Sequence, residues 1–394
     1  MIDLQLKAKA AVQAHHFHPW VFSQGILPHA TEPQSGEVVR VFDDTGQFVA
    51  YAHYSQKSKI ALRLLAWNES EVIDVDWYLH RIAQSIQLRL PKSKLKPKQA
   101  TRLVYSESDR LPGLIVDAFG TYLVVQILSA GMERVRDMIF DHLTQLLKPD
   151  GILELSDAEV RKLEGLEPRV VWQTGADPGE TVIVENGVTF TLNLTEGQKT
   201  GFYLDQTRNR ATVASYTKDK DVLDAFCYSG GFGLHALKAG AKSVRFLDNS
   251  QSALEILKNN LSLNGVSPDE VSIDQGDVFQ ALRKYRDAAR SFDVIILDPP
   301  KFAPTHASLN HASRAYKDIN LWAMKLLRPD GILATFSCSG ALDQESFLRI
   351  IQYAAMDAGR DVQILERLSQ APDHPVRLAF PESDYLKGFI LRIR

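Results

Sequence analysis

From residue 186 onward, short apolar segments alternate with helical ones, and this alternation restricts the possible folds more than any other feature. Five strand-like segments follow one another along the chain: DVLDAF, SVRFLD, VSIDQ, FDVIILD and GILATFS. Helical segments such as SQSALEILKNNLSLNG separate them, with Ser250 as the expected N-cap and Gly265 as the expected stop. Apolar strands that alternate with helices are typical of a doubly wound parallel sheet. We therefore predict an α/β domain over residues 186–394.

The last part of this domain departs from the alternation. A helix is expected over residues 343–357, and two strand-like runs, DVQILERL and YLKGFILRIR, follow it with no helix between them. Two consecutive strands predict a closing β-hairpin, because only antiparallel strands join without a crossover. The last strand of the chain would then run antiparallel in the sheet.

The first half of the chain follows other patterns. Residues 1–75 are rich in strand-like segments, and in GEVVRVFDDTGQFVAYAHYS two of them flank DDTG, which predicts a β-hairpin. Helical periodicity in VDWYLHRIAQSIQLRL is followed by an exposed connector, PKSKLKPKQ, and then by strands with one helix at 133–148. A chain of 394 residues has room for several cores. We predict a β-rich domain (1–75), a small α+β domain (76–185) and the α/β domain (186–394).

Composition excludes several classes of protein. With 45% hydrophobic and 24% charged residues the chain is globular. It lacks both a signal-peptide core and an apolar run near the roughly 20 residues that cross a bilayer, so no membrane is expected. Two cysteines cannot build a disulfide framework, which favours a cytoplasmic location. Without a CxxC pair or a His-rich tract, no metal site is predicted.

The charge distribution gives a weak indication about partners. A net charge of −3 argues against a protein that coats nucleic acid indiscriminately. Residues 77–106, however, contain seven Lys and Arg and no Asp or Glu. Contact with phosphates is one interpretation of this stretch, and a solvated linker is the other. Most charge runs are solvated, so the linker is the interpretation favoured here.

A glycine-rich loop follows the first strand of the α/β domain, in DVLDAFCYSGGFG. Glycines allow a sharp turn and close approach to a ligand, although an ordinary strand–helix turn also uses them. Asp248 ends the next strand, where a carboxylate can hold ribose hydroxyls, and Asp277 follows the third strand, where it could meet an adenine amino group. Asp224 lies inside the first strand, and its charge would repel a pyrophosphate but suits a cationic ligand. This pattern favours S-adenosylmethionine (SAM) over NAD.

Two residues with chemical potential end the next two strands. Asp298 begins DPPK, where the prolines must stop a central strand and hold the carboxylate at its end. Cys338 ends the fifth strand, in FSCSG. A lone cysteine is usually buried and inert, but at a strand end it can act as a nucleophile. A thiolate that adds to carbon 6 of a pyrimidine makes carbon 5 nucleophilic enough to accept a methyl group. Cys227 is interpreted as a packing residue of the glycine loop.

Eight blocks along essentially the whole chain carry a resemblance to a known family: HPWVFSQGI, SESDRLPGLIVDAFGTYLVVQ, EGQKTGFYLDQTRNR, LDPPKF, RAYKDINLWA, FSCSG, DHPV and YLKGF. The chain resembles the ribosomal RNA large subunit methyltransferase I group, the PUA-domain cytosine-5 methyltransferases. The resemblance implies an N-terminal PUA domain that binds RNA, a central α+β domain and a Rossmann-like class I methyltransferase domain. It also implies that Cys338 attacks cytosine, and that GFYLDQTRNR, with Tyr203 and Gln206, lies over SAM.

The sequence thus predicts a SAM-dependent enzyme that makes 5-methylcytosine in large-subunit (23S) ribosomal RNA. Cys338 and Asp298 are the predicted catalytic residues, with Asp298 bonded to the cytosine ring, on which Phe302 could stack. The predicted cofactor site comprises Asp224, Phe226, Ser229, Gly230, Gly231, Gly233, Asp248, Asp277, Tyr203 and Gln206. Ribosomal RNA is the expected partner, and a homodimer is left open.

Some alternatives remain at this point. Related RNA cytosine-5 methyltransferases carry a second cysteine that helps release the product, and DPPK has none. Asp298, Lys301 and His374 are the candidates for the base that removes the carbon-5 proton, and a structural role suits each of them equally. Two other functions compete with the predicted one: a methyltransferase acting on a guanine nitrogen, which needs no cysteine, and a non-catalytic RNA-binding assembly factor.

Overall fold

The computed structural model describes residues 1–195, 202–302 and 309–394. The chain divides into two compact units. Unit 1 comprises Met1–Ile183, Leu192–Leu204 and Asp373–Ser383, and unit 2 comprises Val184–Thr191, Asp205–Pro372 and Asp384–Arg394. The predicted division into three domains stays a prediction. One difference is evident: segments 192–204 and 373–383 belong to unit 1, although the predicted boundary at 186 assigns them to the α/β domain.

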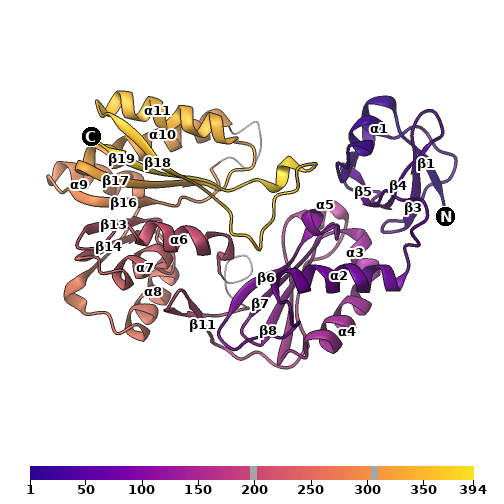
Figure 1. Cartoon of the computed structure of the whole chain (residues 1–394), viewed down its shortest axis with the longest axis horizontal. Helices are drawn as coiled ribbons and strands as arrows, with labels where there is room; N and C mark the ends of the chain where they lie inside the picture. Colours follow the sequence, from indigo (N-terminus) through magenta and orange to yellow (C-terminus); the bar gives the residue numbers. More distant parts are fainter. Residues whose placement is uncertain (196–201, 303–308) are drawn as a thin grey trace. The chain divides into compact units, whose positions relative to one another are not determined.

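The first sheet of unit 1 lies within the first 66 residues. Its strands have the order β1-β3-β4-β5-β2 and are β1 (Asp3–Gln5), β3 (Val38–Phe42), β4 (Phe48–Tyr54), β5 (Ile60–Ala66) and β2 (Trp20–Phe22). Helix α1 (Ala8–His15) packs against it (Figure 1). The predicted hairpin around DDTG is confirmed, since β3 pairs antiparallel with β4. Asp43 explains the turn, because its carboxylate accepts hydrogen bonds from the N–H groups of Thr45 and Gln47, at 2.9 Å each.

The second sheet of unit 1 belongs to the central region. Its strands have the order β10-β9-β8-β7-β6 and are β10 (Arg169–Thr174), β9 (Gly151–Ser156), β8 (Tyr122–Ile127), β7 (Leu114–Phe119) and β6 (Ala100–Tyr105). Its helices are α2 (Val75–Arg89), α3 (Ala130–Arg134), α4 (Arg136–Leu147) and α5 (Val160–Glu164). The helix predicted over 133–148 is interrupted at Val135, where φ −105° and ψ 14° leave the helical region. A short hairpin, β11 (Thr181–Glu185) and β12 (Val188–Leu192), follows.

Unit 2 contains the predicted doubly wound sheet. Its strands have the order β15-β14-β13-β16-β17-β19-β18 and are β15 (Val271–Gln275), β14 (Ser243–Asp248), β13 (Asp221–Ala225), β16 (Phe292–Leu297), β17 (Leu327–Ser337), β19 (Lys387–Ile393) and β18 (Val362–Ser369). The first five strands of this order, from β15 to β17, all run parallel to one another. Strand β19 runs antiparallel to both of its neighbours, β17 and β18. The antiparallel last strand is therefore confirmed, and it is inserted between β17 and β18.

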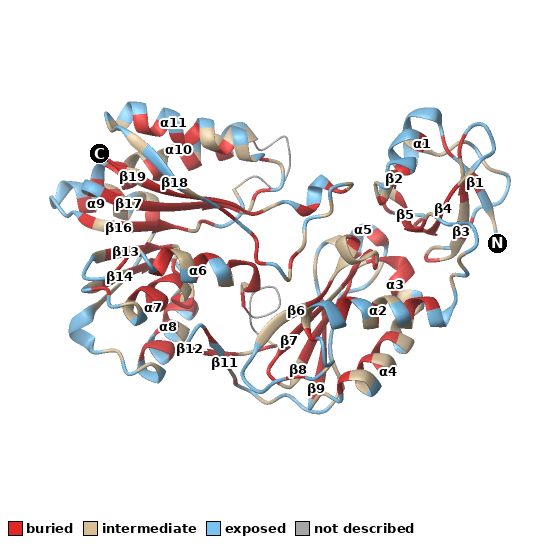
Figure 2. Cartoon of the chain, viewed as in Figure 1, coloured by how far each residue is buried: buried red, intermediate tan, exposed pale blue. Residues whose placement is uncertain are grey.

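Helices cover both faces of this sheet (Figure 1). They are α6 (Thr207–Ala214), α7 (Gly231–Lys238), α8 (Gln251–Leu263), α9 (Val278–Asp287), α10 (Leu309–Leu326) and α11 (Gln344–Ala358). The last three share one core with alternate residues of the strands, whereas α7 and α8 contact β14 from the other face. Ser250 caps α8 as predicted, because its hydroxyl accepts a hydrogen bond from the N–H of Ala253. Figure 2 shows β16, β17 and β19 buried, whereas the edge strand β18 is largely exposed.

In the three described ranges, no helix has the length and apolar character that crossing a membrane requires.

Candidate active site

The carboxyl edge of the unit 2 sheet, where its parallel strands end, brings together most of the predicted site. Strand order changes direction between β13 and β16, which is where open α/β sheets bind ligands. Ala225 and Leu297, the last residues of these strands, are paired. Phe226 and Asp298 follow them directly, and the N–H of Asp298 reaches the Ala225 carbonyl at 3.5 Å. The glycine loop and the DPPK turn therefore start side by side.

Asp224 is a strongly perturbed acid at this edge. Its side chain is buried, and its Oδ2 accepts a hydrogen bond from the N–H of Gly233 at 2.8 Å. Its Oδ1 is buried without a hydrogen-bond partner among the described residues. The pKa of Asp224 is raised to about 8: burial is the main cause, the Gly233 N–H opposes it, and the carboxylates of Asp298 and Asp248 add to it. The site therefore has a carboxyl oxygen and an excess of negative charge that a cationic ligand would satisfy.

The glycine loop adopts a backbone that explains part of its sequence. Gly230 has φ 86°, which only glycine adopts freely, and Phe226 (φ 63°) and Tyr228 (φ 49°) lie in the same left-handed region. Non-glycine residues there are uncommon and typical of functional turns. A Cβ on Gly233 would lie 2.2 Å from a ring carbon of Phe246, so α7 can approach the sheet only with glycine at this position.

Asp248 holds this loop from the neighbouring strand. One carboxylate oxygen accepts a hydrogen bond from the N–H of Tyr228 and the other from the N–H of Ser250, each at 2.9 Å. Ser229 is buried, and its carbonyl accepts a hydrogen bond from the Asn260 side chain at 3.0 Å. Both predicted residues thus take part in the architecture of the loop.

Asp277 has a different immediate role. Its carboxylate accepts a hydrogen bond from the N–H of Gln280 at 2.9 Å and so caps α9. The side chain is exposed, and the preceding Gly276 bonds to the Asp248 carbonyl at 2.9 Å. Asp277 is therefore at the same edge as Asp248, and its contact with an adenine stays a prediction.

Gln206 contacts the predicted catalytic acid, whereas Tyr203 belongs to the other unit. The Gln206 amide donates a hydrogen bond to Asp298 at 3.0 Å and accepts one from Asn209 at 2.6 Å. Gln206 is buried, so this arrangement fixes the half-buried carboxylate of Asp298. Tyr203 is a half-buried residue of unit 1, and its proximity to the cofactor stays a prediction.

Cys338 follows the last residue of β17 and contacts the DPPK turn. Its Sγ lies 3.9 Å from the carbonyl oxygen of Pro299, the residue after Asp298. The thiol is half-buried, whereas Cys227 is buried, which raises its pKa well above the usual range. As predicted, Cys338 and Asp298 lie at one edge of neighbouring strands. The packing role predicted for Cys227 agrees with its burial.

The two serines that flank Cys338 fix the position of this part of the chain. The Ser337 hydroxyl bonds to the phenol oxygen of Tyr316 at 2.9 Å, and the Ser339 hydroxyl bonds to the same oxygen at 3.0 Å. All three side chains are fully buried. Tyr316 thus clamps the chain on both sides of Cys338, so FSCSG is a fixed turn that presents a thiol.

The prediction of site residues missed three side chains. Tyr316 is one of them, and Lys387 is a second, because its buried ammonium donates a hydrogen bond to the Ser339 carbonyl at 2.9 Å. Asp205 is the third: one oxygen accepts a hydrogen bond from the Tyr385 hydroxyl, and the other is buried without a partner among the described residues. All three lie in blocks on which the family resemblance depends, RAYKDINLWA, YLKGF and GFYLDQTRNR, which was the available signal.

The structure also describes the surroundings of the remaining predicted residues, His374, Lys301 and Phe302. His374 is a buried residue of unit 1 that bonds to Asp373 at 2.8 Å. Lys301 is exposed. Phe302 packs against the ring of Tyr316 at a centroid distance of 4.9 Å, and also against the rings of Phe226 and Phe279. These contacts identify Phe302 as a packing residue, and its stacking on a base stays a prediction.

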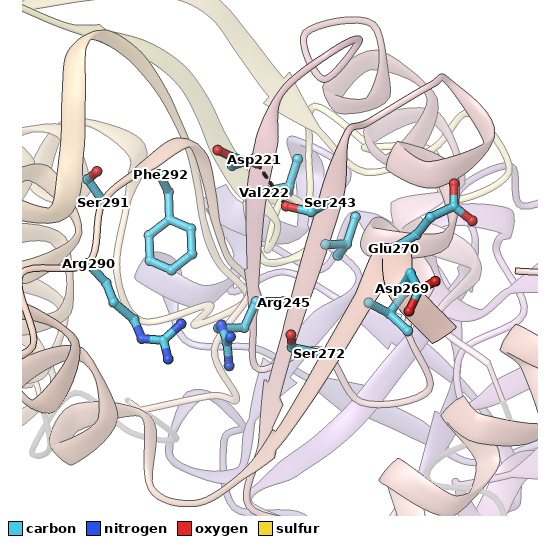
Figure 3. Close-up of a pocket in the computed structure, with 12 residues that line it drawn as sticks. Asp221, Val222, Ser243, Arg245, Asp269, Glu270, Ser272, Arg290, Ser291 and Phe292 are labelled. Atoms are coloured by element: carbon cyan, nitrogen blue, oxygen red, sulfur yellow. Dashed lines mark hydrogen bonds between the residues drawn. The ribbon is translucent and has the colours of Figure 1, made fainter. Parts of the chain in front are cut away.

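A pocket of about 190 Å³ lies at the opposite edge of the same sheet (Figure 3). It is lined by the first residues of four strands, among them Asp221, Ser243 and Phe292. The Ser243 hydroxyl donates to Asp221 at 2.9 Å within it. Because the amino ends of the strands line this pocket, it is separate from the predicted site at the carboxyl edge.

Comparison with known proteins decides the family. A model of S-adenosylmethionine-dependent methyltransferases matches residues 166–389, and a model of a PUA-like domain matches residues 4–67. Ribosomal RNA large subunit methyltransferase I of Aeromonas salmonicida (strain A449) is 46% identical over 378 residues, which cover 96% of each chain. The chain belongs to the ribosomal RNA large subunit methyltransferase I family. The predicted resemblance is confirmed.

Solved structures of this family's fold agree over the full length. A protein from Streptococcus mutans described as a SAM-dependent methyltransferase has a TM-score of 0.85 at 20% identity, and both chains are covered completely. A methyltransferase complexed with SAH has a TM-score of 0.86 at 21% identity, also over both complete chains. The predicted fold class, with an N-terminal PUA-like domain and a C-terminal methyltransferase domain, is therefore confirmed.

This family member is a SAM-dependent methyltransferase, and its site fits the cofactor. SAM carries positive charge on its sulfonium and on its ammonium group. The unpartnered buried oxygen of Asp224 is the acceptor that an ammonium needs, and the surrounding carboxylates favour positive charge. SAM would be held by the side chains of Asp224 and Asp248 and by the backbone N–H groups of the glycine loop.

Proposed function

We propose that this protein forms 5-methylcytosine in large-subunit ribosomal RNA, with Cys338 as the nucleophile. The observation that carries the proposal is the position of Cys338, which is fixed between two clamped serines with its thiol 3.9 Å from the DPPK turn. A thiol held at the carboxyl edge of a methyltransferase sheet suits a methyl acceptor that needs covalent activation. The Aeromonas salmonicida relative, a ribosomal RNA large subunit methyltransferase, supports the choice of substrate.

The chemistry follows from the weakness of carbon 5 as a nucleophile. The Cys338 thiolate adds to carbon 6 of the cytosine, so an S–C6 bond forms and the electrons of the C5=C6 bond become available at carbon 5. SAM, when bound, would supply the methyl group as an electrophilic carbon: a bond from carbon 5 to the methyl group forms, and the bond from sulfur to the methyl group breaks with its electron pair left on sulfur as a neutral thioether. A base then removes the proton from carbon 5, the S–C6 bond breaks, and its electron pair returns to sulfur as the thiolate.

The neighbouring side chains have assigned roles in this proposal. Asp298, oriented by its hydrogen bond from Gln206, bonds to the cytosine ring and stabilises the charge that develops when the thiolate adds. The base that acts on carbon 5 remains among Asp298, Lys301 and His374. The target cytosine must be unpaired or flipped out of its helix, since stacking shields carbons 5 and 6.

Covalent trapping tests the proposal. Ribosomal RNA containing 5-fluorocytosine is incubated with SAM and with wild type, Cys338→Ala or Cys227→Ala, the last being the matched control for loss of a thiol. Fluorine cannot leave as a proton does, so the thioether persists and is resolved by denaturing electrophoresis. We expect a SAM-dependent adduct with wild type and Cys227→Ala only.

A different result would redirect the assignment. If no protein gives an adduct while methyl transfer to ordinary RNA continues, and Cys338→Ala keeps full activity, the cysteine mechanism is wrong. A guanine nitrogen, which needs no covalent activation, would then be the acceptor. An adduct with Cys338→Ala but not with Cys227→Ala would assign the nucleophile to the buried thiol instead.

A further inference from the structure

Lys387 occupies an unusual place for a lysine. It is the first residue of β19 and pairs with Ser337 of β17, directly before Cys338. Only 4% of its surface is exposed, and its Nζ donates a hydrogen bond to the carbonyl of Ser339, directly after Cys338, at 2.9 Å. The ammonium group is thus attached to the same turn that presents the thiol.

A buried ammonium group is unfavourable unless negative charge compensates it. Among the described residues, Lys387 forms no ion pair within 4.0 Å, and its ammonium donates a hydrogen bond to a neutral carbonyl. Burial lowers the pKa of Lys387. Four ionisable groups also act on this pKa: it is raised by Asp384, Cys338 and Asp343, and it is lowered by Lys301. Cys338 is the one of these groups that lies in the clamped turn itself.

We propose that Lys387 is a positioning residue that keeps Cys338 in its thiolate form. When the S–H bond of Cys338 breaks, the proton leaves to solvent and the electron pair stays on sulfur, while Lys387 keeps its own proton. The result is a thiolate in the turn that the buried ammonium of Lys387 reaches through Ser339 and that Tyr316 holds through its two serine contacts. The part of Lys387 in methyl transfer rests on the proposed function, whereas its effect on the thiol does not.

The rate at which iodoacetamide alkylates Cys338 tests this directly, because only the thiolate reacts. The rate is followed from about pH 6 to pH 10 by mass spectrometry of the peptides, in the absence of SAM and RNA. The proteins are wild type, Lys387→Met, Lys387→Arg and Tyr316→Phe. The arginine retains the charge, and the Tyr316 variant disturbs the turn without removing a charge. The peptide with buried Cys227 reports in every sample whether the fold is intact.

We expect a wild-type midpoint below the ordinary thiol value of about 8.5. In Lys387→Met the midpoint should rise by about one unit or more, which makes alkylation at neutral pH about tenfold slower. Lys387→Arg should restore a low midpoint, and Tyr316→Phe should leave the midpoint unchanged even where the maximal rate changes.

Two results would overturn the proposal: a wild-type midpoint at or above about 8.5, or equal midpoints in wild type and Lys387→Met. If Cys227 becomes reactive in Lys387→Met, that variant is unfolded and its midpoint is not used. The midpoints of wild type and Lys387→Arg then decide whether the proposal holds. The proposed function can fail separately. A low midpoint without a fluorocytosine adduct would leave the thiolate established and reject the cytosine chemistry.

Discussion

The raised pKa of Asp224 makes SAM binding dependent on pH, and the size of the effect follows from the structure. With a pKa of about 8 in the ligand-free protein, Asp224 is mostly protonated at pH 6 and must lose its proton to pair with an ammonium group. Ionising it two units below its pKa costs about 2.7 kcal/mol, which corresponds to about 100-fold in affinity. Asp224 is still about half protonated at pH 8, so we expect the dissociation constant of SAM to fall about 50-fold between pH 6 and pH 8.

Isothermal titration calorimetry at several pH values measures this, and Asp224→Asn is the matched control. The amide resembles a protonated carboxyl group in shape and charge and cannot ionise, so the variant should bind SAM more weakly than wild type at pH 6 and show no such pH slope. The two proteins should then diverge further as pH rises, because only wild type acquires the negative charge. Titrations in buffers of different ionisation enthalpy should show that wild type releases close to one proton on binding at pH 6.

A constant wild-type affinity between pH 6 and pH 8 would refute this reasoning, and so would an equal pH slope in Asp224→Asn. The interpretable range ends near pH 8, since the amino group of SAM itself loses its proton above about 8. The same shift affects stability. The folded-state pKa of Asp224 lies above its unfolded value of about 3.9, so its contribution to stability is full below that pH and is lost as pH rises to about 8.

Three further predictions concern the architecture of the site. Gly233→Ala should destabilise unit 2 by about 1–3 kcal/mol in denaturant unfolding, because the new methyl group overlaps Phe246, whereas Gly276→Ala, with no atom within 4 Å, should be close to neutral. Asp248→Asn leaves one acceptor oxygen for two backbone N–H groups, and calorimetry should show SAM binding weakened by about tenfold. Tyr316→Phe leaves two buried hydroxyls without their shared partner, and should lower the free energy of unfolding by about 1–3 kcal/mol and slow formation of the fluorocytosine adduct.

The sequence predicted the features that depend on local patterns. Strand ends, the glycine loop and the N-cap at Ser250 are local signals, and the carboxyl ends of neighbouring parallel strands necessarily share an edge. Asp224, Asp298 and Cys338 could therefore be placed together without coordinates. The capping role of Asp277 was missed, although its position before an amphipathic helix is the usual signal for an N-cap.

Features that depend on long-range pairing could not be predicted in this way. The segment 373–383 lies far along the chain from the other residues of unit 1, the segment 192–204 follows a short stretch of unit 2, and no local pattern reports which core either joins. The break at Val135 was not predicted either, and it is visible only as a change in the backbone angles. The hydrogen bonds of Tyr316 to both serines likewise require α10 to be packed on β17, which periodicity does not reveal.

The direction of β19 shows how such pairing decides the chemistry. In an antiparallel strand inserted beside β17, the first residue of β19 lies opposite the last residue of β17, and the observed register pairs Lys387 with Ser337. A parallel strand in the same place would bring Ile393, an aliphatic residue, to the carboxyl edge instead. The closing hairpin therefore does more than complete the sheet. It brings a buried ammonium to the turn that holds Cys338, so reversing or shifting this strand should remove Lys387 from the thiol while leaving the SAM-binding loop after β13 intact.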